Sequence, residues 1–171
     1  LIQIPDNLYR KECAKLGFDL PDVGDYAVGM VFLPQNKDTQ KACLKAFDTV
    51  VAEEGQSIIG WRDLPVDNSV LGESVKPIEP VIRQIFICRG KNCADTDAFE
   101  RKLFVIRKQV HHKVWDVELE GRGEFYIPSM SSRTIVYKGM MLVGNVDKYF
   151  KDLEDERCQS AIALVHQRFS T

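Results

Sequence analysis

The chain has 171 residues, with 23 Lys and Arg against 25 Asp and Glu, which gives a formal net charge of −2. This length is enough for one hydrophobic core and too short for two full domains. The composition, 44% hydrophobic and 28% charged, is that of a globular protein and excludes a disordered, collagen-like or coiled-coil chain. The near-zero net charge argues against nucleic-acid binding, and no apolar run approaches the ~20 residues of a membrane span.

The opening residues predict the end of a strand followed by a short helix. Asp6 is the expected N-cap of this helix, because a carboxylate in that position accepts hydrogen bonds from the first backbone N–H groups. Leu8, Glu12 and Leu16 share one side of the helix, and Gly17 is its expected C-cap.

Three apolar segments rich in β-type residues predict buried strands. These strands are 26–33, 57–61 and 81–88. Either Asn36 or Asp38 is expected to cap a second helix, whose apolar stripe consists of Cys43, Phe47, Val50 and Val51. The connection 63–80 contains three prolines and the turn signal at 67–69, so we expect a loop held by its own contacts or by another part of the protein.

The strongest helix prediction covers 95–114. Its apolar residues lie within an arc of about 80° at 100° per residue, namely Phe99, Leu103, Ile106 and Val110. Glu100 stands three residues after Asp97, which resembles a capping box with Asp97 as the cap. The basic run 101–113 falls around the outer face of this helix, so it predicts a solvated surface and not a nucleic-acid interface.

The last third of the chain predicts mostly short elements. Residues 123–137 contain two β-rich pieces separated by Pro128 and three serines, which favours a hairpin or a broken strand. One helical turn is expected at 145–150, an acidic loop or helix start at 152–156, and a buried strand at 161–165. Strands and helices do not alternate regularly, so an α+β layered domain is favoured over a doubly wound parallel sheet.

The five cysteines are scattered and odd in number: Cys13, Cys43, Cys88, Cys93 and Cys158. This pattern argues against a secreted disulfide scaffold and predicts reduced thiols in a reducing, cytoplasmic compartment. Cys88 and Cys93 followed by the adjacent pair His111 and His112 lack the spacing of a zinc site, so no metal is expected.

Recognised catalytic motifs, such as a nucleophile elbow or a Walker loop, are missing from the sequence. Three carboxylate pairs are expected to be solvated, and these are Asp63 with Asp67, Glu53 with Glu54, and Asp152 with Glu156. His111 and His112 are expected on the helix surface. The remaining site-like feature is Arg168, just past an expected strand and followed by small hydroxyl residues, a pattern that suits a carboxylate ligand. The alternative is an arginine paired with a carboxylate of the protein itself.

Several blocks of the sequence resemble, in the same order, the glutaminase domain of the glutamate synthase large subunit, a class II glutamine amidotransferase. They span nearly the whole chain and include LIQIP, GDYAVGMVFLPQ, VVAEEGQSIIGWRDLPVDNSVLGESVKPIEPVIRQIFI, DAFERKLFVIRKQ, FYIPSMSSRTIVYKGM and DERCQSAIALVHQRFST. The resemblance implies an N-terminal nucleophile hydrolase fold, a four-layer α/β/β/α sandwich of two antiparallel sheets.

The resemblance also implies an activity. In this family an N-terminal cysteine attacks the side-chain amide of L-glutamine, a glutamyl thioester forms, and ammonia leaves. The ammonia passes to a synthase domain of the same chain, which carries FMN and an iron–sulfur cluster and converts 2-oxoglutarate to glutamate. The electrons come from an NAD(P)H-oxidising small subunit or from ferredoxin.

Only part of such a site is expected in this chain. Arg168 matches the arginine that holds the α-carboxylate of glutamine, Thr171 a residue of the same substrate loop, and Phe169 the bulky residue that covers it. The family's catalytic cysteine stands upstream of LIQIP, and its oxyanion asparagine–glycine pair stands downstream of Thr171. Residues 1–171 are therefore expected to be the central part of one such domain, inactive alone and without a cofactor of its own. The alternative is a non-catalytic packing or regulatory module.

Overall fold

The structure, a computed structural model, describes residues 1–142 and 144–166. Its helices are α1 (Asp6–Lys15), α2 (Lys37–Glu53), α3 (Thr96–Trp115) and α4 (Val146–Tyr149). The strands are β1 (Ile2–Gln3), β2 (Tyr26–Leu33), β3 (Ser57–Asp63), β4 (Val81–Cys88), β5 (Tyr126–Ser131) and β6 (Thr134–Ile135). Short 3-10 turns are η1 (Asn68–Val70), η2 (Lys76–Ile78), η3 (Arg122–Glu124) and η4 (Lys151–Glu154). The strands predicted at 26–33 and 81–88 are confirmed, and the one predicted at 57–61 continues for two further residues.

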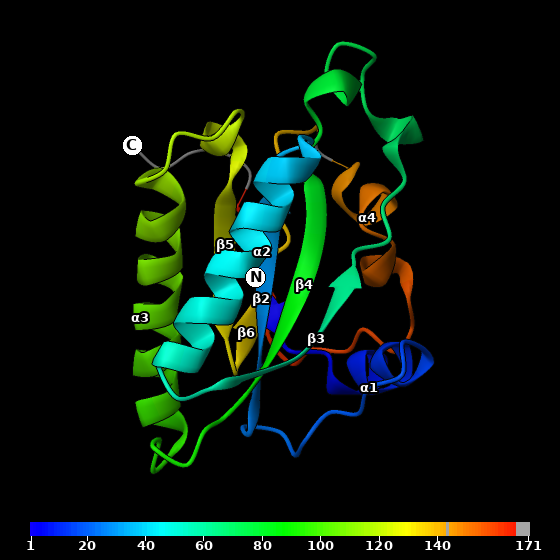
Figure 1. The fold of residues 1–171 in the computed structure, drawn as a ribbon. Helices are drawn as coiled ribbons and strands as arrows, with labels where there is room; N and C mark the ends of the chain where they lie inside the picture. Colours follow the sequence, from blue (N-terminus) through cyan, green and yellow to red (C-terminus); the bar gives the residue numbers. More distant parts are fainter. Residues whose placement is uncertain (143, 167–171) are drawn as a thin grey trace.

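An antiparallel sheet with the strand order β3-β4-β2-β5 forms the centre of the fold (Figure 1). Strands β2 and β4 pair over their whole lengths, from Tyr26 opposite Cys88 to Leu33 opposite Val81. Both faces of β2 are covered, which explains its continuous apolar sequence. Strand β5 lies at the edge, where Pro128 is tolerated inside a strand because its missing N–H costs no ladder hydrogen bond.

The predicted break between two β-rich pieces is confirmed, although it lies beyond Pro128. The chain leaves the four-stranded sheet after Ser131 and resumes at Thr134 as β6. Strand β6 belongs to a second antiparallel sheet, in which Ile135 lies opposite Ile2 of β1. The fold is therefore α+β with two antiparallel sheets.

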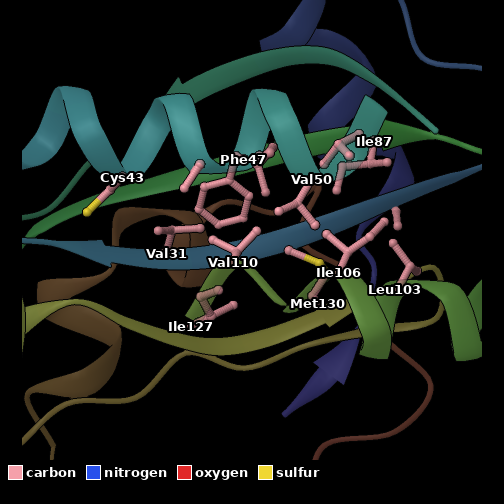
Figure 2. Close-up of a cluster of buried hydrophobic side chains, with 14 of the residues drawn as sticks. Val31, Cys43, Phe47, Val50, Ile87, Leu103, Ile106, Val110, Ile127 and Met130 are labelled. Atoms are coloured by element: carbon pink, nitrogen blue, oxygen red, sulfur yellow. The ribbon is translucent and has the colours of Figure 1, made fainter. Parts of the chain in front are cut away.

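Helices α2 and α3 cover one face of the central sheet (Figure 1). Figure 2 shows Phe47 and Val50 of α2 lying close to Ile106 and Val110 of α3, in one buried cluster. Every residue of the two predicted apolar stripes is buried. On the outside, Lys102 binds Glu54 at 2.6 Å and Lys113 binds Glu53 at 3.3 Å, so this carboxylate pair joins the two helices and is not simply solvated.

The helix N-termini are capped partly as predicted. The Asn36 side chain accepts hydrogen bonds from the backbone N–H groups of residues 38 and 39, which selects Asn36 over Asp38. In α3 the cap is Asp95, which accepts from the backbone N–H of Ala98 at 2.7 Å. The prediction of Asp97 as the cap is wrong, because Asp97 already lies within the helix and binds Arg133.

The prediction for the cap of α1 is also wrong. Asp6 is the first residue of the helix and not its N-cap, and its carboxylate accepts hydrogen bonds from Arg10 Nε and the Tyr26 hydroxyl, both at 2.8 Å. The C-cap of α1 is Leu16 and not the predicted Gly17, which follows it with a φ of +86°. The buried side of α1 carries Leu8, Tyr9 and Cys13, whereas Leu16 is 53% exposed.

A second core fills the other face of the central sheet. There α1, the β1–β6 sheet and α4 pack against Met30 and Phe86, with Ile135 and Phe150 fully buried. The connection 64–80 is held against α4, since Val66 bridges to Phe150 and the Asp67 N–H donates to the Tyr149 carbonyl at 2.8 Å. This confirms the prediction of a loop held by another part of the protein. Among the described helices, none combines the length and the apolarity that crossing a membrane requires.

Candidate functional site

The three predicted substrate residues, Arg168, Phe169 and Thr171, lie outside the described residues. The structure does describe the segment that leads to them, residues 155–166, which we call the arm. The arm follows η4 and runs back along β1, where Ala163 bridges antiparallel to Ile2. The contacts of the arm therefore describe the segment that directly precedes the three predicted substrate residues.

Polar contacts join the arm to β1. The Gln3 backbone N–H donates to Ser160 Oγ at 3.0 Å, and the Gln3 side-chain oxygen accepts from the Ala161 N–H at 2.9 Å. Next to the bridge between Ile2 and Ala163, the backbone groups of Leu1 and Leu164 exchange two hydrogen bonds, at 2.8 and 2.9 Å.

The prediction of a buried strand at 161–165 is wrong. Ile162, Leu164 and Val165 are 56%, 65% and 91% exposed. The segment makes a single bridge to a two-residue strand, and no described layer covers its apolar side chains. Continuous apolar sequence therefore did not correspond to burial in this segment.

A salt bridge joins the arm to α1. Arg157 Nη2 binds Glu12 Oε1 at 2.8 Å and also binds Asp155 Oδ2 at 2.5 Å, within the arm. The hydrogen bonds from Arg157 lower the pKa of Asp155 to about 2. The pKa of Glu12 is lowered mainly by the hydrogen bond from Lys15, and the hydrogen bond from Arg157 lowers it further. Both carboxylates are therefore ionised near neutral pH. The contact between Arg157 and Glu12 is thus an ion pair that joins the arm to α1.

A ring of hydrogen-bonded polar side chains includes Asp152 of η4, the turn that directly precedes the arm. Arg62 binds both oxygens of Asp152, at 2.7 and 2.8 Å, and donates to the Gln84 side-chain oxygen at 2.7 Å. Gln84 donates to the Tyr9 hydroxyl at 3.0 Å. The Tyr9 hydroxyl lies 3.0 Å from the Tyr137 hydroxyl, which donates to Asp152 at 2.9 Å. The ring thereby joins α1, β3, β4, η4 and the chain after β6.

Sequence reasoning missed this ring. Asp152 was expected to be solvated together with Glu156, yet Asp152 is 2% exposed while Glu156 is exposed. Its partner Arg62 is 90 residues away in the sequence, so no local pattern reveals the pair. Desolvation, with the nearby Asp152 carboxylate, raises the pKa of Tyr9 well above its usual value, so this hydroxyl stays protonated.

A cleft of about 620 Å³ opens beside the arm, at the N-terminus of α3. Its lining mixes polar and apolar groups and consists of Gln3, Ile4, Val23, Gly24, Thr96, Ser132, Arg133, Gln159, Ser160 and Ala161. The wall at Ser132 is fixed by Glu100, which accepts from the Ser132 N–H at 2.5 Å and from its hydroxyl at 2.6 Å. Glu100 therefore fixes this turn and does not form the predicted capping box.

The other predicted candidates do not form a reaction centre. Asp63 is exposed beside Arg83, and His112 is exposed on α3. His111 is half-buried, with its ring centroid 5.6 Å from that of Trp115, and desolvation lowers its pKa. Among the described residues, no group of three His, Cys, Asp or Glu side chains is arranged to hold a metal ion.

All five cysteines carry thiols and not disulfides. Desolvation raises the pKa of the Cys13 thiol to about 12, and burial likewise raises the pKa of Cys43 and of Cys158 to about 11. A thiol with such a pKa is almost entirely protonated at neutral pH, and it is the thiolate that acts as a nucleophile. These three cysteines are therefore in structural positions.

Comparison with known proteins places this chain in a family. The model of the glutamine amidotransferases class-II matches residues 1–171. The chain is 45% identical over its whole length to the glutamate synthase (NADPH) large chain of Bacillus subtilis, of which it covers 11%. It is 39% identical, over 98% of its length, to the glutamate synthase (NADH) of Schizosaccharomyces pombe and covers 8% of that protein.

A ferredoxin-dependent relative is also similar. The chain is 33% identical over its whole length to the chloroplastic ferredoxin-dependent glutamate synthase 2 of Arabidopsis thaliana. The chain spans about a tenth of the length of these relatives. Its α+β fold with two antiparallel sheets agrees with the N-terminal nucleophile hydrolase fold of the class. The chain therefore belongs to the class II glutamine amidotransferases.

Proposed function

We propose that this chain is part of the domain of a glutamate synthase that hydrolyses L-glutamine to glutamate and ammonia, and that the ammonia is used to aminate 2-oxoglutarate. The observation that carries the proposal is similarity along the whole chain to NADPH-, NADH- and ferredoxin-type glutamate synthases. The proposal covers the complete protein, since residues 1–171 span about a tenth of such relatives.

Within this chain, Arg168 holds the α-carboxylate of glutamine, Phe169 covers the bound substrate, and Thr171 belongs to the same substrate loop. A guanidinium group is suited to this task, because its planar fork gives a carboxylate two parallel charge-assisted hydrogen bonds. The contacts between the arm and β1 support the assignment, since they hold the chain as far as Leu164, four residues before Arg168.

The nucleophilic cysteine and the oxyanion donors belong to parts of the domain outside residues 1–171, which form its central part. The raised pKa values of Cys13, Cys43 and Cys158 support this proposal. Nucleophile, oxyanion donors and binding groups act as a unit, so residues 1–171 alone have no glutaminase activity.

In the complete protein the synthase domain carries FMN and an iron–sulfur cluster, which together deliver electrons to 2-oxoglutarate. The described residues offer no ligand set for such a cluster, so we assign none of them to it. The electrons come from an NAD(P)H-oxidising subunit or from ferredoxin, and the relatives include enzymes of both kinds. The protein acts in the cytoplasm.

A second candidate function is a non-catalytic module used for packing or regulation. The full-length protein distinguishes the two when it is given glutamine labelled with ¹⁵N in its amide, 2-oxoglutarate and each electron donor in turn. The proposed function predicts ¹⁵N in the amino group of newly formed glutamate. Absence of ammonia release and of labelled glutamate with every donor would leave only the non-catalytic module.

A further inference from the structure

The outer face of α3 carries apolar side chains that the two described cores do not use. Phe99 and Leu103, which pack α3 against the sheet, are fully buried on the inner side of the helix. On the opposite side Phe104 is 58% exposed, and Val105 and Trp115 are exposed as well. A surface helix normally turns a polar face to water, and exposed apolar groups gathered on one face mark a contact surface.

The basic residues of the same face lack acidic partners among the described residues. Residues 101–115 contain five Lys and Arg and neither Asp nor Glu, although the whole chain has a net charge of only −2. Two of the five bind the glutamates at the end of α2. The other three form no salt bridge with any residue that the structure describes, and these are Arg101, Arg107 and Lys108. Lys108 Nζ lies 5.8 Å from the centroid of the Phe104 ring, so the apolar and basic groups form one continuous surface.

We propose that the outer face of α3 is the surface on which the synthase domain of the complete protein docks, through an acidic patch with an apolar side chain at its centre. That apolar side chain seats on Phe104 and Val105, and the surrounding carboxylates pair with Arg101 and Lys108. The inference rests on the proposed function and adds to it the face of the glutaminase domain that meets the other domain.

The occupant follows from the length of the relatives and from the charge of the face. The chain covers 11% of its Bacillus subtilis relative, so most of a complete protein of this kind lies outside residues 1–171. An acidic surface complements the three cations, whereas a second copy docked about a two-fold axis would bring the same basic face against itself. The synthase domain must also keep a fixed place while ammonia passes to it, and a helix whose inner side is packed into a core is a rigid platform for that contact.

The first test asks whether the face is covered in the full-length protein. Phe104→Cys is compared with Lys45→Cys, since Lys45 is exposed on α2 with polar residues one turn away on either side. Native Phe104→Cys is expected to react with iodoacetamide about tenfold more slowly than native Lys45→Cys, because the centre of a domain contact excludes solvent. Both positions are expected to react at the same rate after denaturation, and peptide mass spectrometry measures the rates.

The second test measures the ammonia that escapes to solvent for each glutamate formed. The double variant Arg101→Glu with Lys108→Glu is expected to raise this escape about threefold, because reversed charges repel the acidic patch and loosen the contact. Its kcat/KM for the hydrolysis of glutamine is expected to stay within about twofold of wild type, since neither residue lies at the substrate. Lys45→Glu, which reverses an equally exposed charge on α2, is expected to match the wild type in both measurements.

The failures are distinguishable. A wild-type protein that releases no ammonia and forms no glutamate overturns the proposed function and the docking face together. In an active wild type, equal labelling of Phe104→Cys and Lys45→Cys overturns the docking face alone, as does unchanged ammonia escape in the double charge reversal. Protection of Phe104→Cys that requires an added electron-donor protein, or that is lost when the protein is diluted to a monomer, would assign the face to a separate subunit or to a second copy and so overturn the proposal.

Discussion

Asp152 lies in a position that its neighbours in the sequence do not reveal. It stands in an acidic stretch, yet its carboxylate is 2% exposed and bound by Arg62 and Tyr137. Burying two charges is tolerated here because each has a complete set of partners, closed through Gln84 and Tyr9. Residue type and local hydropathy identify exposed acids well, but a pair formed across 90 residues requires the fold.

Removing one partner of this buried pair should destabilise the protein strongly. Asp152→Asn or Arg62→Met leaves a buried charge without its partner, so we expect a loss of about 3–5 kcal/mol in the free energy of unfolding. Replacing both residues, as Arg62→Met with Asp152→Asn, should cost less than the sum of the two single changes.

Denaturant unfolding measures these effects, and Lys41→Met is the control, since its pair with Asp38 is largely exposed. The control should change the free energy of unfolding by less than about 0.5 kcal/mol. A similar small change for Arg62→Met would contradict the structural role assigned to the ring.

The cysteine thiols give a second prediction for single residues. With a pKa of about 12, roughly one Cys13 thiol in ten thousand is ionised at pH 8, and burial limits access to it further. We expect iodoacetamide at pH 8 to label Cys88 before Cys13 and Cys43 in the native protein, and all five cysteines after denaturation. Peptide mass spectrometry measures the order, and rapid labelling of native Cys13 would be inconsistent with its assigned place in the core.

Periodicity identified the longer helices and strands because it reports burial directly. The stripes on α2 and α3 and the apolar run of β2 are buried as expected. Helix ends were harder to predict, since Asp95 and Asp97 both precede an apolar stripe and only the backbone geometry decides which one accepts the hydrogen bond. The apolar run at 161–165 failed for a related reason: an exposed edge segment and a buried strand have the same composition.

The cap of α3 can be tested with two substitutions two residues apart. Asp95→Ala should destabilise the protein by about 1 kcal/mol, because it leaves N–H groups at the start of the helix without a side-chain acceptor. Asp97→Ala removes only an exposed contact to Arg133 and should cost less than about 0.5 kcal/mol. Thermal or denaturant unfolding compares them, and a larger loss for Asp97→Ala would reverse the assignment of the cap.

At the scale of the whole molecule, the order of the strands is what sequence patterns left undetermined. Strands β2 and β5 are about 100 residues apart in the chain yet neighbours in the sheet, and β6 changes sheets only three residues after β5 ends. Spacing of the elements predicted an α+β domain and no more. The two-sheet architecture was expected from resemblance to a family, on the strength of blocks such as those around Arg62 and Ser132.

For the candidate site as well, local sequence pattern, the family resemblance and the structure each contributed a different part of the account. Local pattern made Arg168 a carboxylate ligand with an intramolecular ion pair as the alternative, and the resemblance gave the carboxylate an identity. The structure contributes the arm and its contacts with α1 and β1, none of which had a sequence signal beyond an arginine that follows the acidic residues 154–156. Long-range contacts therefore account for most of what the sequence did not predict.

The most direct test of the central claim is the kinetics of ammonia release from glutamine by the full-length protein carrying Arg168→Ala, with Arg168→Lys and Arg133→Ala beside it. Loss of a bidentate charge-assisted contact predicts a fall of about 100-fold in kcat/KM for Arg168→Ala, mostly through KM, and a partial loss for Arg168→Lys. Arg133→Ala, which removes the arginine of the neighbouring cleft, should match the wild type. Unchanged kinetics in Arg168→Ala, or the larger loss in Arg133→Ala, would contradict the assignment of the substrate carboxylate to Arg168.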